Sequence, residues 1–153
     1  MTVRPAEEAD IEMMSHIIGL YAAEGLMLPR SRAGLLAELP HYVVAEVEGS
    51  IVGCGGLHPY SSASGEIYGL ATAPNQSPRG TGGAILTALV QRAIERRLSK
   101  VFALTLAPGF FEKQGFRTVN HSELPEKVWR DCVACPKFGN CDEIAMVLDL
   151  QAA

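Results

Sequence analysis

A glycine-rich turn that leads into an amphipathic helix constrains the fold of this chain more than any other segment. The turn is Arg79-Gly80-Thr81-Gly82-Gly83-Ala84, and the spacing of apolar residues after it predicts a helix over Gly83–Leu98. Strand-like apolar runs stand on either side of this unit, at Glu66–Ala73 and Val101–Leu106. A strand, a connection of helix length and a second strand favour a parallel pair within one sheet.

The other segments predict an α+β fold with a mixed, largely antiparallel central sheet flanked by helices. Glu48-Gly49-Ser50 separates two β-rich runs and favours an antiparallel hairpin, because glycine adopts positive φ without steric penalty. Gly115 follows a short helical segment and suits a left-handed helix cap. The remaining expected elements are strands at Thr2–Arg4, Tyr42–Val47, Ile51–Leu57 and Ile144–Leu150, and helices at Ala9–Ala23, Arg32–Glu38 and Pro108–Gln114.

Length and composition favour a single domain, residues 1–153, with one active site. The chain has 13 Lys+Arg against 17 Asp+Glu, a net charge of -4, and no basic run that would follow a nucleic-acid backbone. Its apolar stretches are shorter than the ~20 residues that span a bilayer. We therefore expect a cytoplasmic protein that binds neither nucleic acid nor membrane, and a homodimer stays open as its assembly.

The glycine-rich turn predicts a binding site for an anion. A loop without bulky side chains that enters a helix presents backbone N–H groups at the positive end of the helix dipole. The turn lacks the lysine and Ser/Thr of a P-loop, and it lacks the spacing of a dinucleotide-binding fingerprint. Glycines that merely allow a tight connection are the alternative explanation.

The neighbouring segments give this turn a family resemblance. Glu66–Thr72, the turn with its helix, and Phe110-Phe111-Glu112-Lys113-Gln114-Gly115-Phe116 together resemble the GNAT superfamily of N-acetyltransferases. Within it, the chain is most similar to short, single-domain N-acetylglutamate synthases. Segments that carry this second resemblance are Gly25–Ser31, Val52–Cys54, Phe102–Thr105, Leu124–Trp129 and Cys132–Phe138.

This resemblance implies a GNAT-like sheet in which two parallel strands splay apart at the site of acetyl-CoA, the co-substrate. The main chain of Leu70, Ala71 and Thr72 would bind the pantetheine arm, and backbone N–H groups at the splay would meet the oxyanion. The residues expected around the pyrophosphate are Arg79, Gly80, Thr81, Gly82, Gly83 and Ala84. The family pattern Q/R-x-x-G-x-G/A also fits three residues earlier, starting at Ser77, so its register stays open.

The resemblance also suggests catalytic residues. Glu66 occupies the position where many relatives keep a general base, and an ordinary solvent-exposed carboxylate is the alternative. Many relatives place a tyrosine acid where this chain has Phe111, which cannot donate a proton. Tyr68 or water would then protonate the departing thiolate.

Glutamate, the acceptor suggested by the resemblance, needs cations for its carboxylates. Arg30 lies in the loop that covers the acceptor site in this superfamily and is the leading candidate. Other cations are Arg32, Lys113, Arg117, Lys127 and Arg130. The predicted reaction is acetylation of a small amino acid, as in the first step of arginine biosynthesis. Acetylation of another small amine and a non-catalytic acyl-CoA sensor are the alternatives.

The four cysteines are unevenly placed. Cys54 stands alone, while Cys132, Cys135 and Cys141 crowd into one short segment. C-x-x-C spacing can hold a metal or form a redox disulfide, but two well-spaced ligand pairs are missing. We therefore expect no metal, with free thiols as the default and a metal or redox switch as alternatives.

Overall fold

The computed structural model describes residues 1–61, 63–120, 123 and 143–150. Within these residues, one seven-stranded sheet has the order β1-β2-β3-β4-β5-β7-β6. The strands are β1 (Thr2–Pro5), β2 (Tyr42–Val47), β3 (Ser50–Pro59), β4 (Ser64–Thr72), β5 (Lys100–Thr105), β6 (Arg117–Val119) and β7 (Ile144–Asp149). The helices are η1 (Glu8–Asp10), α1 (Ile11–Ala22), α2 (Arg32–Ala37), η2 (Leu39–His41), α3 (Thr81–Glu95) and α4 (Pro108–Lys113).

The strand pairing confirms the predicted fold class. β4 and β5 are parallel, and every other neighbouring pair is antiparallel, including the predicted hairpin of β2 and β3. Gly115 follows α4 with φ +94°, as the predicted left-handed cap requires. β6 was not predicted; it has only three residues and lies beyond β7 at the sheet edge.

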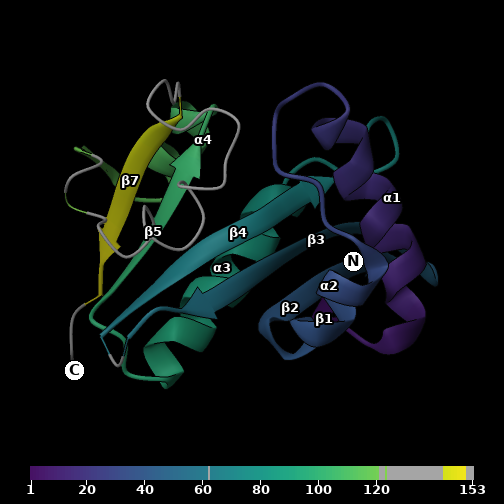
Figure 1. Cartoon of the computed structure of the whole chain (residues 1–153), viewed down its shortest axis with the longest axis horizontal. Coiled ribbons are helices and arrows are strands. Elements are labelled where there is room, and N and C mark those ends of the chain that lie inside the picture. The colour runs from purple at the N-terminus through teal and green to yellow at the C-terminus, as the bar shows by residue number, and fades with distance from the viewer. Residues whose placement is uncertain (62, 121–122, 124–142, 151–153) are drawn as a thin grey trace.

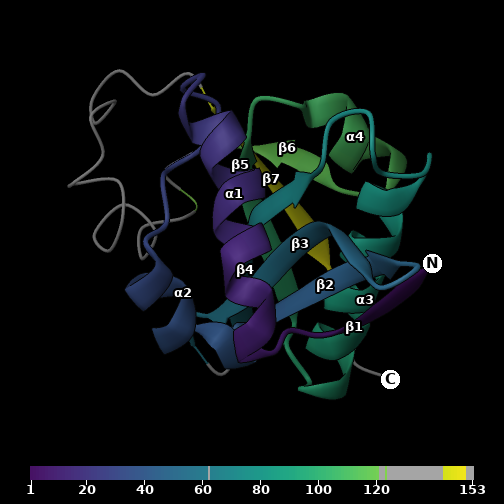
Figure 2. The same ribbon diagram turned by 90° about the vertical axis from the view of Figure 1, so that its right-hand side faces the viewer.

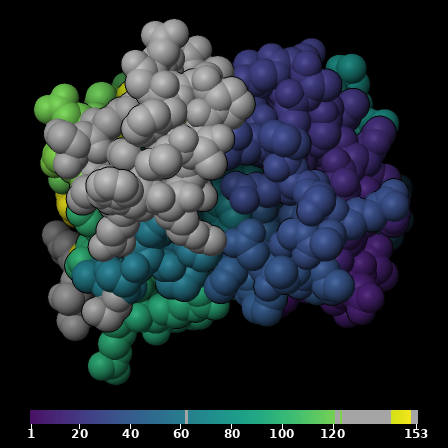
Figure 3. Space-filling view, in the orientation of Figure 1, coloured from purple at the N-terminus to yellow at the C-terminus, as the bar shows by residue number. Residues whose placement is uncertain are grey.

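The helices cover opposite faces of the sheet. Figure 2 shows α1 and α2 on one face and α3 on the other. In the space-filling view, the purple and blue atoms of the N-terminal elements cover the right-hand half of the molecule (Figure 3). Ile85, Leu86 and Leu89 of α3 pack into one core cluster, whereas Met14, Ile17 and Ile18 of α1 belong to a second.

The parallel strands β4 and β5 stay paired over a short distance only. Their partners are Ser64 with Lys100, Gly65 with Val101 and Glu66 with Phe102. Beyond this last pair the two strands diverge, as the green and teal arrows show (Figure 1). The predicted splay is therefore present, and it begins at Glu66.

A β-bulge lies in β4 just past the point of divergence. Gly56 pairs with Tyr68 and Cys54 with Ala71, so Gly69 and Leu70 together oppose Gly55. Gly69 has φ +61°, and a Cβ there would lie 2.9 Å from the hydroxyl oxygen of buried Tyr42. The extra residue interrupts the alternation of side chains along the strand. Each side chain after the bulge therefore lies on the other face of the sheet from the one it would occupy in a regular strand.

We predict that Gly69→Ala lowers the free energy of unfolding by about 1–3 kcal/mol, because it combines left-handed strain with a close contact. Gly19 is the matched control: it is exposed within α1, and a Cβ there meets nothing within 4 Å. Gly19→Ala should raise stability by up to about 1 kcal/mol. Urea unfolding would measure both, and equal stability of the two variants would contradict the role given to Gly69.

Candidate active site

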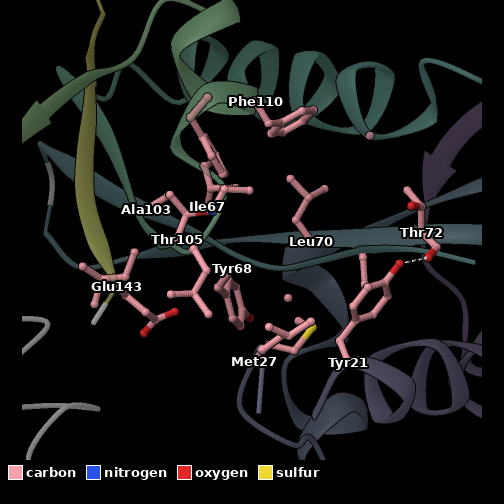
Figure 4. Close-up of a pocket in the computed structure, with 18 residues that line it drawn as sticks. Tyr21, Met27, Ile67, Tyr68, Leu70, Thr72, Ala103, Thr105, Phe110 and Glu143 are labelled. Carbon is pink, nitrogen blue, oxygen red and sulfur yellow. Dashed lines mark hydrogen bonds between the residues drawn. The ribbon is translucent and has the colours of Figure 1, made fainter. Parts of the chain in front are cut away.

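A cavity of about 430 Å³ opens where β4 and β5 diverge. Its walls come from β4, the end of β5, the end of α1 with the loop after it, the first turn of α3 and α4 (Figure 4). The predicted cofactor residues that line it are Leu70, Ala71, Thr72 and Gly82. Arg79, Gly80, Thr81, Gly83 and Ala84 are not among the lining residues, and they lie at or just before the start of α3.

Small and apolar residues shape one wall of this cavity. Leu70 and Phe110 point toward one another from β4 and α4 (Figure 4). A Cβ added to Gly82 would lie 3.4 Å from the Phe110 ring, so glycine keeps the space between α3 and α4 open. Phe111 lines the cavity and also packs into the core.

The first turn of α3 supplies backbone donors. Gly80 caps the helix with φ +90°, Thr81 N–H donates to Pro78 O, and Ala84 N–H donates to Gly80 O. Between them, the N–H groups of Gly82 and Gly83 have no backbone acceptor within the described part of the chain. The dipole of this 15-residue helix adds positive potential here, so the turn can bind an anion.

Hydrogen bonds within the preceding loop hold this turn in place. The Ser77 hydroxyl and N–H both donate to Ala73 O, at 3.0 and 3.2 Å. The Thr81 hydroxyl donates to Pro78 O at 2.6 Å. Arg79 is exposed on the outside of the loop. Of the two registers, the one starting at Ser77 therefore has its first residue engaged in supporting the loop.

Glu66 is only 3 % exposed, so the alternative of a solvent-exposed carboxylate is wrong. It is the last residue of β4 that pairs with β5, and its partners are His58 on β3 and Phe102 on β5. The Tyr60 hydroxyl donates to Glu66 Oε1 at 3.1 Å. Glu66 lies two residues from Tyr68, so both side chains point to the same face of the strand.

Tyr68 joins the cavity to a group of charged residues. Its ring lines the cavity, and its hydroxyl donates to Glu38 Oε1 at 3.2 Å. Arg30 stacks on the ring, with Cζ 5.0 Å from the centroid, and its Nη1 lies 3.9 Å from Glu38 Oε2. His58 Nδ1 approaches the same carboxylate at 3.4 Å. Arg30 thus reaches the cavity wall through Tyr68 and is not itself a lining residue.

Burial raises the pKa of the Tyr68 phenol well above its ordinary value, and the neighbouring Tyr42 and Glu38 act in the same direction. A phenol whose proton is held this tightly transfers it poorly to a thiolate. Sequence reasoning named Tyr68 but missed Glu38 and His58. Neither residue belongs to a recognisable motif, and only the fold brings them together.

Two of the other five expected cations have partners elsewhere. Arg32 pairs with Glu12 at 2.7 Å, and Arg117 pairs with Asp149 at 3.0 Å, both on the surface. Lys113 is exposed at the end of α4. Lys127 and Arg130 lie outside the described residues.

Cys54 is buried and its thiol approaches Gly69 O at 3.5 Å, where burial raises its pKa to about 12. Cys132, Cys135 and Cys141 lie outside the described residues. Within those residues, no group of three or more His, Cys, Asp or Glu side chains could hold a metal ion. None of the helices in the described ranges has the length and apolarity needed to cross a bilayer.

Comparison with known proteins identifies the family. The profile of the acetyltransferase (GNAT) family matches residues 12–116. The chain therefore belongs to the GNAT family of acetyltransferases, and its cavity is the candidate active site of such an enzyme.

Particular relatives refine this assignment. An N-acetyltransferase of Chlorobaculum tepidum is 36% identical over 148 residues, which are 97% of this chain and 96% of the relative. An amino-acid acetyltransferase of Mycobacterium tuberculosis is 30% identical over 151 residues, covering 97% of this chain and 84% of its own. The amino-acid acetyltransferase of Neisseria meningitidis is 31% identical over 133 residues, but this chain spans only 30% of its length.

Two solved structures share the whole fold. A Mycobacterium tuberculosis protein in complex with coenzyme A superimposes with a TM-score of 0.86 at 27% identity, covering 99% of this chain and 100% of that one. N-acetylglutamate synthase from Neisseria gonorrhoeae, complexed with coenzyme A and N-acetyl-glutamate, gives 0.88 at 27% identity, covering 98% of this chain and 35% of that one.

The raised pKa of Tyr68 has a consequence for alkaline stability. Its folded-state pKa exceeds the unfolded value of about 10, so the unfolded chain loses this proton first. The stability that this group contributes is therefore fully present below about pH 10 and is lost as the pH rises toward the folded-state pKa. Tyr68→Phe should make that fall shallower without abolishing it, because burial also raises the pKa of Tyr42. Urea unfolding at pH 9, 10 and 11 measures the slope, and a slope equal to that of the wild type would contradict the shift.

Proposed function

We propose that this acetyltransferase transfers the acetyl group of acetyl-CoA to the amino group of L-glutamate, making N-acetylglutamate for arginine biosynthesis. The observation that carries the acceptor is the place of Arg30, a cation held against Tyr68 at the wall of the cavity. Relatives named amino-acid acetyltransferase and a neighbour bound to N-acetyl-glutamate support it.

The residues present suit acetyl-CoA as the donor. The cavity lies between the diverging strands, where unpaired main-chain groups of β4 would bind the pantetheine amides. The N–H groups of Gly82 and Gly83 and the dipole of α3 would bind the pyrophosphate. The absence of a Cβ at Gly82 leaves room beside Phe110 for the donor to pass.

Glu66 would act as the general base. An amino acid arrives as an ammonium ion, and attack on the thioester needs the neutral amine. Glu66 does not line the cavity, so a water molecule would carry the proton from the amine to it. Backbone N–H groups at the splay would stabilise the oxyanion.

Water is the better candidate for protonating the thiolate. Phe111 has no proton to give, and the Tyr68 hydroxyl is engaged by Glu38 with its pKa raised. A thiolate of pKa about 8.5 leaves readily near neutral pH without a dedicated acid. Tyr68 then serves as a wall of the cavity and a platform for Arg30.

Arg30 would bind a carboxylate of the acceptor. Its side chain is 22% exposed, and its Nε is buried without a hydrogen-bond partner among the described residues. The pairing with Glu38 at 3.9 Å is long for a salt bridge, so the guanidinium retains donors for a ligand. The cation–π contact with the Tyr68 ring helps to hold the guanidinium in place, and its fork of donors suits a bidentate contact with a carboxylate.

The acceptor is tested by release of free thiol from acetyl-CoA across a panel of amines. Glutamate should accelerate release, and Arg30→Ala should raise its KM by about tenfold or more through loss of a charged hydrogen bond. Arg32→Ala, two residues away on the surface, should stay within about twofold of wild type.

Acceleration by another amine but not by glutamate would overturn the acceptor. Saturable coenzyme A binding with no transfer to any amine would instead favour an acyl-CoA sensor.

The base is tested by Glu66→Gln, which keeps the shape and an acceptor for Tyr60 but cannot take a proton. We expect kcat/KM to fall by about 10²-fold or more at low pH, with a smaller defect at high pH where neutral amine is abundant. Glu95→Gln, on an exposed position of α3, should leave the pH–rate profile unchanged. An unaltered profile in the Glu66 variant would rule this residue out.

A further inference from the structure

The edge of β4 that faces β5 has no strand partner among the described residues where the cavity opens. Among the described residues, β5 pairs with β4 no further than Glu66, while the other edge of β4 stays on β3 as far as Thr72. The Ala73 N–H points to the β3 side, where it donates to Val52 O at 2.8 Å. The backbone N–H and C=O groups of successive residues in a strand point to alternate edges of that strand. Those of Thr72 therefore point away from β3, toward the cavity.

One side chain takes the place of the missing strand at Thr72. The hydroxyl of Tyr21 donates to Thr72 O at 2.6 Å, across 51 residues of sequence. The ring of Tyr21 also lines the cavity, and Figure 4 shows the hydroxyl meeting the strand from the α1 side. Together with the bond from Ala73 N–H to Val52 O, this bond fixes the orientation of the peptide unit between Thr72 and Ala73, and it leaves the N–H of Thr72, in the preceding peptide unit, available to a ligand.

The main chain of Tyr21 is fixed in turn by the end of α1. Leu26 N–H donates to Tyr21 O at 3.0 Å and Gly25 N–H donates to Ala22 O at 3.0 Å, while Gly25 has φ +73°. These two bonds around a left-handed glycine form a Schellman motif, in which Tyr21 and Leu26 occupy the positions that make its apolar contact. Both residues line the cavity. The loop that begins at this cap leads to Arg30.

We infer that Tyr21 is a positioning residue for the transfer reaction, and that the Schellman motif is the device that holds it. Its hydroxyl orients the Thr72 main chain for the pantetheine arm, and its backbone anchors the loop that carries Arg30. One residue thus ties the donor strand to the acceptor loop. The inference rests on the proposed use of acetyl-CoA but not on glutamate as the acceptor.

Tyr21→Phe tests the hydroxyl while keeping the ring. We expect the dissociation constant for coenzyme A, measured by calorimetry, to rise about fivefold, as loss of one oriented hydrogen bond implies. KM for acetyl-CoA should rise by the same factor, with kcat within about twofold. Ser99→Ala is the matched control, since it removes a hydroxyl bond to a backbone carbonyl, Ala63 O at 2.9 Å, at the paired end of β5. It should leave coenzyme A binding unchanged.

Binding of coenzyme A to Tyr21→Phe within twofold of wild type would overturn the inference, whatever happens to the melting temperature. A wild-type protein that does not bind coenzyme A would instead contradict the proposed function. The two failures are therefore distinguishable.

Gly25→Ala tests the cap, because alanine strains the left-handed position without meeting another atom within 4 Å. Gly49→Ala carries the same strain at φ +81° with equally open space, in the hairpin between β2 and β3. We expect the first to weaken coenzyme A binding about threefold and the second to leave it unchanged. Combining Gly25→Ala with Tyr21→Phe should add little to Tyr21→Phe alone. Equal effects of the two glycine variants, or full additivity, would contradict a cap that acts through Tyr21.

Discussion

The loss of pairing between β4 and β5 beyond Glu66 creates the cavity and determines which main-chain groups face it. Burying a strand edge without hydrogen-bond partners costs free energy. Each unpaired N–H and C=O group along that edge must therefore bond to a side chain, to water or to a ligand. Tyr21 satisfies the C=O of Thr72, and the start of α3 offers further donors nearby. The cavity is therefore a break in the sheet rather than a hollow added to its surface.

The bulge at Gly69 separates two tasks along one strand. Before it, Glu66 and Tyr68 point to the face of α1 and α2, where Glu38 and Arg30 lie. After it, the shifted alternation places Leu70 on the face of α3, where a Cβ at Gly55 would meet it. The residues proposed for proton transfer and acceptor binding thus lie on the sheet face covered by α1 and α2. Leu70, proposed to lie beside acetyl-CoA, is on the face covered by α3. A regular strand would put Leu70 beneath α1.

Much of this architecture follows from local sequence, because the strand, glycine turn and helix each have their own pattern. The hairpin at Gly49 and the cap at Gly115 could be predicted since glycine stands where positive φ is needed. The bulge at Gly69 could not be predicted, because a single glycine inside an apolar run does not reveal whether it adopts positive φ. Helical spacing places Tyr21 on the apolar face of its helix, but it does not show that the hydroxyl bonds to a carbonyl 51 residues away. The contacts of Glu38 with Tyr68 and His58 are equally non-local.

The break in the sheet also bears on the order in which the chain can fold. β2, β3 and β4 pair with their sequence neighbours, and β1 pairs with β2 across the connection that contains α1 and α2, so these four strands can pair before β5 is synthesised. β5 finds only three partners on β4, and its long antiparallel partner is β7, with Lys100 opposite Asp149. Closing the loop between β5 and β7 costs chain entropy, and only the completed pairing of these two strands compensates for that cost. The wall of the cavity that β5 provides can thus gain its full pairing only once β7 has been synthesised.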